Sequence, residues 1–597
     1  MIAENFLGYR EGVDILQIPS NYLSYPSKNC LCYKGKVVSR LGTKNDGVAP
    51  TEDTRVHSEY VWKKAPAGAK SLRVWGTTLQ VKWQGKWITI FDGFTAGTTR
   101  VRFTSWVDTN NPVIKSRLFM VDGSKKIFEW NGAIGTIASV AGTVVTISDT
   151  KTLSQLGFDA GNVTNRNVKL VRFSGGAITD ITEYTHADTL SGNDDLTLTT
   201  TPTLVPTAGD LMIGSVIAHT DKLNTFDKDD IFTYKNHLFV ANFEEGRIYY
   251  SHSIAYLDFV IPVTKTAITA DLLDLDGKFT AMISRKNVLW ISTTDDWFKV
   301  TKTIEQNEYG YWTNVEKFEQ AESVGAKPYA VAINKGDVVF MGQDKLLRNI
   351  TTLEITGVDD IQLISDGIDG LLGRFEWDDV RIYYHQRYIY VISANEAVTV
   401  MLDIVSGEFQ PPQYIGITCI SIIDNVRYAH SNSRNETMYL FEGRNDLGGE
   451  IEVVMATGFT SGKNNFRQQR HNQFGMHARA TDTTICDIEY QYEEFGAKEL
   501  RPAQFTVGNI TRYEIPVDVS FGANPLATHT YAGIDDTPDA SLKGFFIFDK
   551  QNSIAWFNFR PVFTWSGTDV EAHLLGWSIE NEDADRLIGG ELFINRT

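Results

Sequence analysis

Cysteine is scarce in this sequence, and its spacing excludes a disulfide scaffold. Only four cysteines occur in 597 residues, at Cys30, Cys32, Cys419 and Cys486. Small secreted domains that depend on disulfides carry a much denser set. Cys30 and Cys32 form a lone C-x-C pair with no second pair at zinc-binding spacing. We therefore predict isolated thiols in a reducing, cytosol-like compartment.

Positive charge is also in short supply. The chain has 56 Lys and Arg residues against 74 Asp and Glu residues, a formal net charge of -18. Proteins that grip nucleic acid need a basic surface that neutralises phosphates. The balance therefore argues against a tight DNA- or RNA-binding protein. It is compatible with a protein past which DNA slides without being held.

Several patterns that carry catalytic or membrane functions are missing. No apolar run of about 18 residues occurs, and the N-terminus lacks the regions of a signal peptide, so we expect no membrane span. The sequence has no G-x-S-x-G elbow, no phosphate-binding P-loop, no H-E-x-x-H motif and no sialidase-type S-x-D-x-G-x-x-W box. We therefore predict a protein that is not an enzyme and uses no cofactor or metal.

Short runs of alternating apolar and polar residues dominate the chain. Hydrophobic residues make up 42% and aromatic residues 12%, enough to build substantial cores. Runs such as residues 79–83, 87–91, 143–147 and 247–251 are bounded by Gly, Asn and Asp. This alternation is typical of strands joined by tight turns, and the period of an amphipathic helix is almost absent. The expected fold class is all-β.

One apolar strand motif recurs every 50 residues. Its copies begin at Leu238, Val288, Val338, Tyr388 and Met438. Two earlier stretches, residues 72–91 and 116–130, fit the same template. Units of three or four strands every 40 to 50 residues are typical of β-propeller blades. We therefore predict a β-propeller of about six or seven blades, held in residues 51–134 and 221–444.

The rest of the chain is expected to form two further β-domains. Residues 135–220 are rich in Thr, Val, Gly and Asp and contain no Trp, which predicts a small β-barrel or sandwich threaded between two blades. The pattern of residues 445–597 predicts the strands of a C-terminal β-sandwich. Residues 1–50 would close the propeller, because an N-terminal strand can complete the last blade and hide its edge. We expect Lys36 to Arg40 to be that strand.

Two groups of side chains allow a carbohydrate function. Carboxylates that converge on one pocket could hydrolyse a glycoside, whereas Asp pairs in turns bond the backbone, which is the interpretation we prefer. The Asp pairs are Asp229–Asp230, Asp295–Asp296, Asp359–Asp360, Asp378–Asp379 and Asp535–Asp536. Aromatic residues could bind sugar, but in blades they more often fill the space between neighbours. These are Trp290, Trp297, Trp312, Trp377 and Tyr388.

The most basic local run mixes cations with aromatic residues between positions 463 and 474. Nucleic-acid binding is one interpretation, but the rest of the chain is acidic, so we favour a solvated loop or a contact with another subunit or an adaptor. The candidate contact residues are Lys463, Phe466, Arg467, Arg470 and His471.

Several strand patterns resemble one family. Residues 232–242 (FTYKNHLFVAN) and 247–252 (RIYYSH), followed by Asp258-Phe259, are similar to a sequence pattern that recurs in phage tail proteins. The blade-like stretches 279–298 and 117–131 and the opening stretches 12–23 and 38–42 fit the same pattern. The sequence thus resembles the tail nozzle, or tail tubular protein B, of short-tailed phages, together with related propeller hub proteins. The resemblance covers roughly residues 5–445 and, more loosely, the C-terminal sandwich.

This resemblance implies a structural virion protein, assembled in the host cytoplasm and located in the tail. It implies a homo-oligomeric ring, commonly a hexamer, beneath the portal and adaptor, with viral DNA leaving through the ring without specific binding. The family offers no catalytic residues to transfer. The alternative is a carbohydrate-binding or glycoside-hydrolysing propeller, such as a receptor-binding tail module. A cellular scaffold propeller that binds peptides is a third possibility.

Overall fold

The fold is built almost entirely from β-strands. The computed structural model describes residues 2–12, 15–95, 100–107, 116–158, 167–174, 177–186, 194–203, 206–219, 226–235, 237–244, 246–251, 271–275, 277–301, 314–317, 324–352, 359–423, 425–461, 469–481, 485–493, 505–506, 513–514, 530–533, 541–548, 558–566 and 572–583. In these residues the helices are η1 (Ile15–Gln17), α1 (Leu153–Leu156) and α2 (Asp369–Arg374). None of them is long and apolar enough to cross a membrane.

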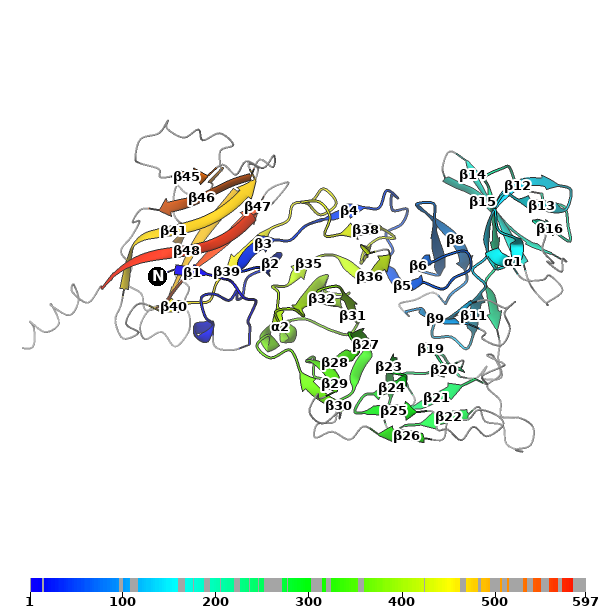
Figure 1. Ribbon diagram of the computed structural model, residues 1–597, viewed down its shortest axis with the longest axis horizontal. Helices are drawn as coiled ribbons and strands as arrows, with labels where there is room; N and C mark the ends of the chain where they lie inside the picture. Colours follow the sequence, from blue (N-terminus) through cyan, green and yellow to red (C-terminus); the bar gives the residue numbers. More distant parts are fainter. Residues whose placement is uncertain are drawn as a thin grey trace, which may run out of the picture.

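Seven antiparallel sheets follow one another as the blades of a propeller (Figure 1). Blades 1 and 2 are β5 (Val56–Trp62), β6 (Lys70–Trp75), β7 (Thr78–Trp83) and β8 (Lys86–Asp92), then β9 (Arg102–Trp106), β10 (Arg117–Val121), β11 (Ile127–Trp130) and β18 (Ile217–His219). Blades 3 and 4 are β19 (Asp230–Tyr234), β20 (His237–Ala241), β21 (Arg247–Tyr250) and β22 (Asp271–Asp274), then β23 (Phe279–Arg285), β24 (Val288–Thr293), β25 (Trp297–Thr301) and β26 (Asn314–Lys317).

The ring continues through three more blades and closes on itself. Blade 5 is β27 (Ala326–Asn334), β28 (Asp337–Gly342), β29 (Leu347–Thr352) and β30 (Asp359–Leu363); blade 6 is β31 (Val380–His385), β32 (Tyr388–Ser393), β33 (Val398–Asp403), β34 (Glu408–Phe409) and β35 (Gln413–Tyr414). Blade 7 is β36 (Ile417–Ile423), β37 (Val426–Ser431), β38 (Thr437–Leu440) and β4 (Thr43–Asn45). The first strands β5, β9, β19, β23, β27, β31 and β36 contact one another in a closed ring, so the predicted all-β propeller is confirmed.

Aromatic residues fill the spaces between blades. Trp290 and Trp297 of blade 4 are almost fully buried, and Trp297 meets Phe340 of blade 5 edge-to-face, with ring centroids 5.0 Å apart. Trp87 of blade 1 meets His430 of blade 7 in the same way, at 6.2 Å. Such contacts couple neighbouring sheets that share no backbone hydrogen bonds.

The 50-residue repeat marks the second strand of four blades. Leu238, Val288, Val338 and Tyr388 lie in β20, β24, β28 and β32, which are second strands. Met438 breaks the series, because it lies in β38, the third strand of blade 7, whose second strand is β37. The fifth recurrence is therefore a coincidence of loop lengths.

The inserted domain interrupts a single blade. Its sheet has the order β15 (Ala177–Thr185), β14 (Asn167–Ser174), β17 (Leu211–Gly214), β12 (Ile134–Ala141), β13 (Val144–Ile147) and β16 (Asp195–Thr197). The expectation of a domain threaded between two blades was wrong. The chain leaves blade 2 after β11 and returns to it as β18, which pairs with β11 through residues 217–219. The fourth strand of blade 2 is thus supplied after the insertion.

The C-terminal sandwich also uses the N-terminus. One sheet holds β1 (Ile2–Glu4), β2 (Cys30–Tyr33), β3 (Lys36–Ser39), β41 (Gln469–Thr481), β45 (Thr530–Gly533), β46 (Ser541–Phe548) and β48 (Ala572–Asp583). The other holds β39 (Val453–Ala456), β40 (Thr460–Ser461), β42 (Ile485–Glu493), β43 (Phe505–Thr506), β44 (Tyr513–Glu514) and β47 (Asn558–Ser566). Figure 1 places this sandwich and the inserted domain at opposite ends of the long axis of the molecule.

The strand that closes the propeller is not the expected one. Lys36 to Arg40 was predicted, but β3 pairs with β48 in the sandwich, where the buried Val37 contributes to the core. The closing strand is β4, which pairs with β38 of blade 7. Between these strands the chain passes close to the backbone of Asn445: a Cβ added to Gly42 would lie 1.9 Å from the Asn445 carbonyl oxygen. Glycine is therefore required where the chain crosses from sandwich to propeller.

A single hydrophobic core joins the propeller to the sandwich. It contains buried side chains of blade 6, such as Val391 and Val400, together with Trp565 and Leu574 of the sandwich and Cys32 of the N-terminal segment. Nearby, Arg40 is almost fully buried, and its Nη1 donates to Asp446 Oδ1 at 2.9 Å. The two domains are therefore expected to resist relative movement.

Truncating Trp565 tests this shared core. Because the residue is fully buried, we expect Trp565→Ala to lower the free energy of unfolding by about 3–5 kcal/mol. Hydrogen exchange should rise in β32 of blade 6 as well as in the sandwich. Leu363→Ala serves as the control, because Leu363 is 47% exposed and its truncation should change stability by less than about 0.5 kcal/mol. Faster exchange confined to the sandwich would contradict a common core.

Candidate functional site

The basic run singled out in the sequence is only partly within the described chain. Lys463, Phe466 and Arg467 lie outside the described residues. Arg470 and His471 lie in β41, where the backbone register places Arg470 opposite Glu582 of β48 and His471 opposite Asn581. These two positions thus belong to a strand rather than a loop. A subunit or adaptor contact here stays a prediction.

One member of each of three acidic pairs, Asp230, Asp359 and Asp379, forms an ion pair with an arginine. Arg102 Nε lies 2.7 Å from Asp230 Oδ1, and Arg285 Nη1 lies 2.8 Å from Asp359 Oδ1. Although burial opposes it, hydrogen bonds from Lys299 and Arg285 lower the pKa of Asp359 to about 2. A carboxyl group with so low a pKa is a poor proton donor. Asp535 and Asp536 lie outside the described residues.

The candidate sugar-binding tryptophans are packing residues where the structure describes them. Trp290, Trp297 and Trp377 are 0–1% exposed, and the Trp377 Nε1 donates to the Leu372 carbonyl oxygen at 2.8 Å. Trp312 lies outside the described residues, and Tyr388 is half-buried. Of the three described tryptophans, none presents a ring face to solvent.

Ring closure assembles a polar cluster that no sequence spacing indicates. It consists of Glu59 on β5, Arg100 just before β9, Arg102 on β9, Tyr329 on β27 and Arg381 on β31. These elements belong to blades 1, 2, 5 and 6 and include the innermost strands of the ring. We call these five residues the axial cluster. Four of them keep partial exposure, whereas Arg381 is 1% exposed.

Arg381 is held by a carboxylate on one side. Its Nε and Nη2 atoms each lie 3.1 Å from an oxygen of Asp379, which Arg55 also approaches at 3.6 Å. Burial lowers the pKa of Arg381 and Asp379 raises it, with a net rise above the ordinary value. The remaining Nη1 atom is buried and has no hydrogen-bond partner among the described residues. Arg381 therefore stays charged and keeps unused hydrogen-bonding capacity.

Arg100 and Arg102 both lie against the ring of Tyr329. Their guanidinium carbons are 5.0 and 4.6 Å from its ring centroid, within cation–π range. Tyr329 sits at a register shift of β27 with φ of 58°, a left-handed conformation that is uncommon for a bulky residue. Its hydroxyl donates to the Asp229 carbonyl oxygen at 2.7 Å. The bulge thus directs this side chain toward the two arginines.

Glu59 ends a chain of hydrogen bonds that joins blade 7 to blade 1. Arg73 Nη1 donates to Thr437 Oγ1 at 2.8 Å, and Thr437 Oγ1 lies 3.0 Å from His430 Nδ1. His430 Nε2 lies 2.8 Å from Ser421 Oγ, which donates to Glu59 Oε2 at 3.1 Å. Burial and the charge of Arg73 hold the pKa of His430 well below its ordinary value, so its imidazole is neutral.

Each donor in this chain finds an acceptor if the proton of His430 is on Nε2. Arg73 then donates to Thr437, Thr437 to Nδ1 of His430, Nε2 of His430 to Ser421, and Ser421 to the Glu59 carboxylate. Burial nevertheless raises the pKa of Glu59 to about 7, because it outweighs Ser421 and the charges of Arg100 and Arg381. The seam at which the propeller closes is therefore polar, and it contains a carboxyl group, that of Glu59, with a pKa near neutral pH.

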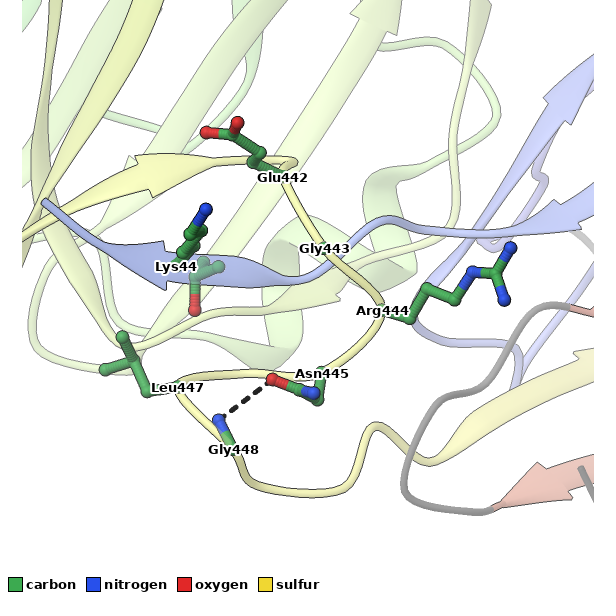
Figure 2. A pocket seen from close by; sticks show the side chains of 8 residues that line it. Lys44, Glu442, Gly443, Arg444, Asn445, Leu447 and Gly448 are labelled. Atoms are coloured by element: carbon green, nitrogen blue, oxygen red, sulfur yellow. Dashed lines mark hydrogen bonds between the residues drawn. The ribbon is translucent and has the colours of Figure 1, made fainter. Parts of the chain in front are cut away.

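Two surface pockets lie near the junction of propeller and sandwich. One, of about 470 Å³, is bordered by the closing strand and residues 442–448 (Figure 2). There Glu442 and Arg444 point away from each other, and Asn445 Oδ1 accepts from the Gly448 backbone at 2.9 Å. The second, of about 480 Å³, has mainly apolar walls that include Tyr33, Leu41 and Phe441. Within the described chain, no cluster of His, Cys, Asp and Glu could hold a metal ion.

Comparison with known proteins finds only distant structural likenesses, one of them to a β-propeller domain. No protein-family model and no curated protein matches the sequence. The β-propeller domain of Cps50 (Swd1) from Myceliophteria thermophila is 9% identical, with a TM-score of 0.34, over 67% of this chain and 99% of that one. Sqt1 from Saccharomyces cerevisiae is 7% identical, with a TM-score of 0.30, over 66% and 99%. BBS1N, solved in complex with ARL6DN, is 9% identical, with a TM-score of 0.32, over 66% and 94%.

The raised pKa of Glu59 predicts a pH-dependent stability. The folded pKa of about 7 lies above the ordinary 4.5, so the carboxyl group stabilises the fold when protonated and loses that contribution as pH rises from about 4.5 to 7. Glu59→Gln lacks this titration. We therefore compare the free energy of unfolding of Glu59→Gln with that of the wild type by urea denaturation at pH 5 and pH 8. The difference, variant minus wild type, should be about 1–3 kcal/mol larger at pH 8 than at pH 5.

The exposed Glu396 supplies the control for that experiment. Glu396→Gln removes the same charge from a solvated position, so its difference from the wild type should be equal at both pH values. A Glu59→Gln difference that is equally independent of pH would show that Glu59 does not titrate near neutrality.

Proposed function

We propose that this protein is a structural subunit of a phage tail that assembles as a ring and conducts DNA without binding it specifically. The observation that carries the proposal is the shared core of propeller and sandwich, which makes one rigid body from the two ends of the chain. A conduit under mechanical load needs such rigidity.

The strand patterns behind the family resemblance lie in pairs of neighbouring strands within the blades. Residues 232–234 and 237–241 lie in β19 and β20, the first and second strands of blade 3. Residues 279–285 and 288–291 lie in β23 and β24, the same two strands of blade 4, whereas residues 117–121 and 127–130 lie in β10 and β11, the second and third strands of blade 2. Asp258 and Phe259 lie outside the described residues. The resemblance therefore concerns how blades are built, which suits a family whose role is architectural.

Charge supports a conduit of low affinity. With a net charge of -18, an assembled ring would on average repel phosphates, so DNA would move through it without being captured. The charged pairs on the described propeller axis, such as Arg102 with Asp230, lie inside one subunit and do not set the charge of a channel between subunits.

Exposed apolar residues mark a surface for subunit contacts. Large hydrophobic side chains that are at least 37% exposed are Leu7, Tyr25, Tyr33, Leu41, Ile181, Leu363, Val405, Tyr414, Val426 and Leu447. All but two of these, Ile181 and Leu363, belong to the N-terminal segment, blades 6 and 7, or the chain leaving blade 7. Tyr33 and Leu41 also line the apolar pocket. We therefore place the contact between copies at this end of the propeller.

Electron microscopy and native mass spectrometry of the purified protein test the proposal. We expect rings, with six or twelve copies, and we expect Leu41→Asp to shift them toward monomers because it puts a charge into an apolar contact. Leu363→Asp is the matched control, since Leu363 has a similar exposure, 47% against 50%, but lies on β30 of blade 5. A monomer that binds sugars on a glycan array would contradict the tail assignment and favour a carbohydrate-binding propeller.

A further inference from the structure

The axial cluster contains two arginines with unused hydrogen bonds. The Nη1 atoms of Arg100 and Arg381 are both buried and have no partner within the described part of the chain. Arg100 makes no hydrogen bond or ion pair with any described residue, and its guanidinium carbon lies 5.0 Å from the ring centroid of Tyr329. A buried donor without an acceptor costs free energy, so it calls for a partner such as a water molecule or a bound ion.

The two guanidinium groups also repel each other. Burial lowers the pKa of Arg100, and the charge of Arg381 lowers it further. Around them, three guanidinium groups (Arg55, Arg100 and Arg381) face two carboxyl groups, Asp379 and Glu59. The pKa of Glu59 is about 7, so this carboxyl group is only partly ionised at neutral pH. An excess of positive charge therefore remains at the axis of a strongly acidic protein.

The backbone is strained at Tyr329, beside the two arginines Arg100 and Arg102. Tyr329 adopts a left-handed conformation, with φ of 58°, at the bulge that brings it under Arg100 and Arg102. A bulky residue in this region is energetically unfavourable and persists where the surrounding structure enforces it. The bulge therefore holds the Tyr329 ring within cation–π distance of Arg100 and Arg102.

We propose that Arg100 and Arg381 bind a small oxyanion, of the carboxylate or phosphate class, at the propeller axis. An oxyanion would accept hydrogen bonds from both Nη1 atoms and neutralise the excess charge of the cluster. The planar guanidinium fork suits two oxygens of one ligand, and enclosure by the blades strengthens each charged hydrogen bond. This site is a property of one subunit, so it does not depend on the proposed role in a tail.

Isothermal titration calorimetry of the full chain tests the site. The probes are inorganic phosphate and, in a second arm, succinate, each against sodium chloride at equal ionic strength. We expect at least one oxyanion to bind, and Arg100→Gln to weaken that binding at least tenfold. Arg100→Lys should recover part of the affinity, because it restores the charge without the fork. Lys64→Gln, which removes an exposed cation from a turn of blade 1, should leave binding unchanged.

Thermal unfolding separates a binding role from a structural one. Because Arg100 is partly buried, is repelled by Arg381 and has no ionic partner in the described chain, Arg100→Gln should melt at the same temperature as the ligand-free wild type or higher. The bound oxyanion should raise the melting temperature of the wild type only. Binding that is unaffected by Arg100→Gln, heats no larger than those of chloride, or a marked loss of stability in both Arg100 variants would overturn the proposal.

Discussion

The closure of the seven-bladed ring is the constraint on which the rest of the molecule depends. Blade 7 is completed by β4, three residues near the N-terminus, which pair with β38. The same chain has just left the sandwich through β3, so one crossing at Gly42 ties the two domains together. Across the closing seam, a chain of hydrogen bonds from Arg73 to Glu59 fastens blade 7 to blade 1. Closure therefore determines both the rigidity of the subunit and the composition of its axis.

The axial cluster exists only because the ring is closed. Arg100 and Arg381 are far apart in sequence and lie in blades 2 and 6, yet their charges act on each other. A propeller can place polar residues at its axis because the first strands present alternate side chains there, away from the apolar layers between blades. These layers carry the packing, which leaves the axis available for binding.

Much of the fold could be predicted from sequence because it depends on local, apolar patterns. The repeat at Leu238, Val288, Val338 and Tyr388 marks the second strands of four blades, which are largely buried and apolar. The closing strand was misplaced because Thr43–Asn45 is short and polar and is held by backbone pairing, whereas Lys36–Ser39 has the buried Val37. The axial cluster could not be predicted, because its residues come from four blades whose distances only ring closure sets. An arginine in a strand pattern gives no sign that it lacks a partner.

The most direct test of this account is a cross-link across the closing seam. Lys44 of β4 lies opposite Tyr439 of β38, so the double variant Lys44→Cys, Tyr439→Cys should form a disulfide within one chain under mild oxidation. Mass spectrometry would identify the linked peptides, with Val38→Cys, His573→Cys as the reference pair in the sandwich. The account predicts a link in both variants. A third variant, Val38→Cys, Tyr439→Cys, tests whether β3 closes the ring instead. The account would be contradicted if this third variant formed a disulfide and the Lys44→Cys, Tyr439→Cys variant did not.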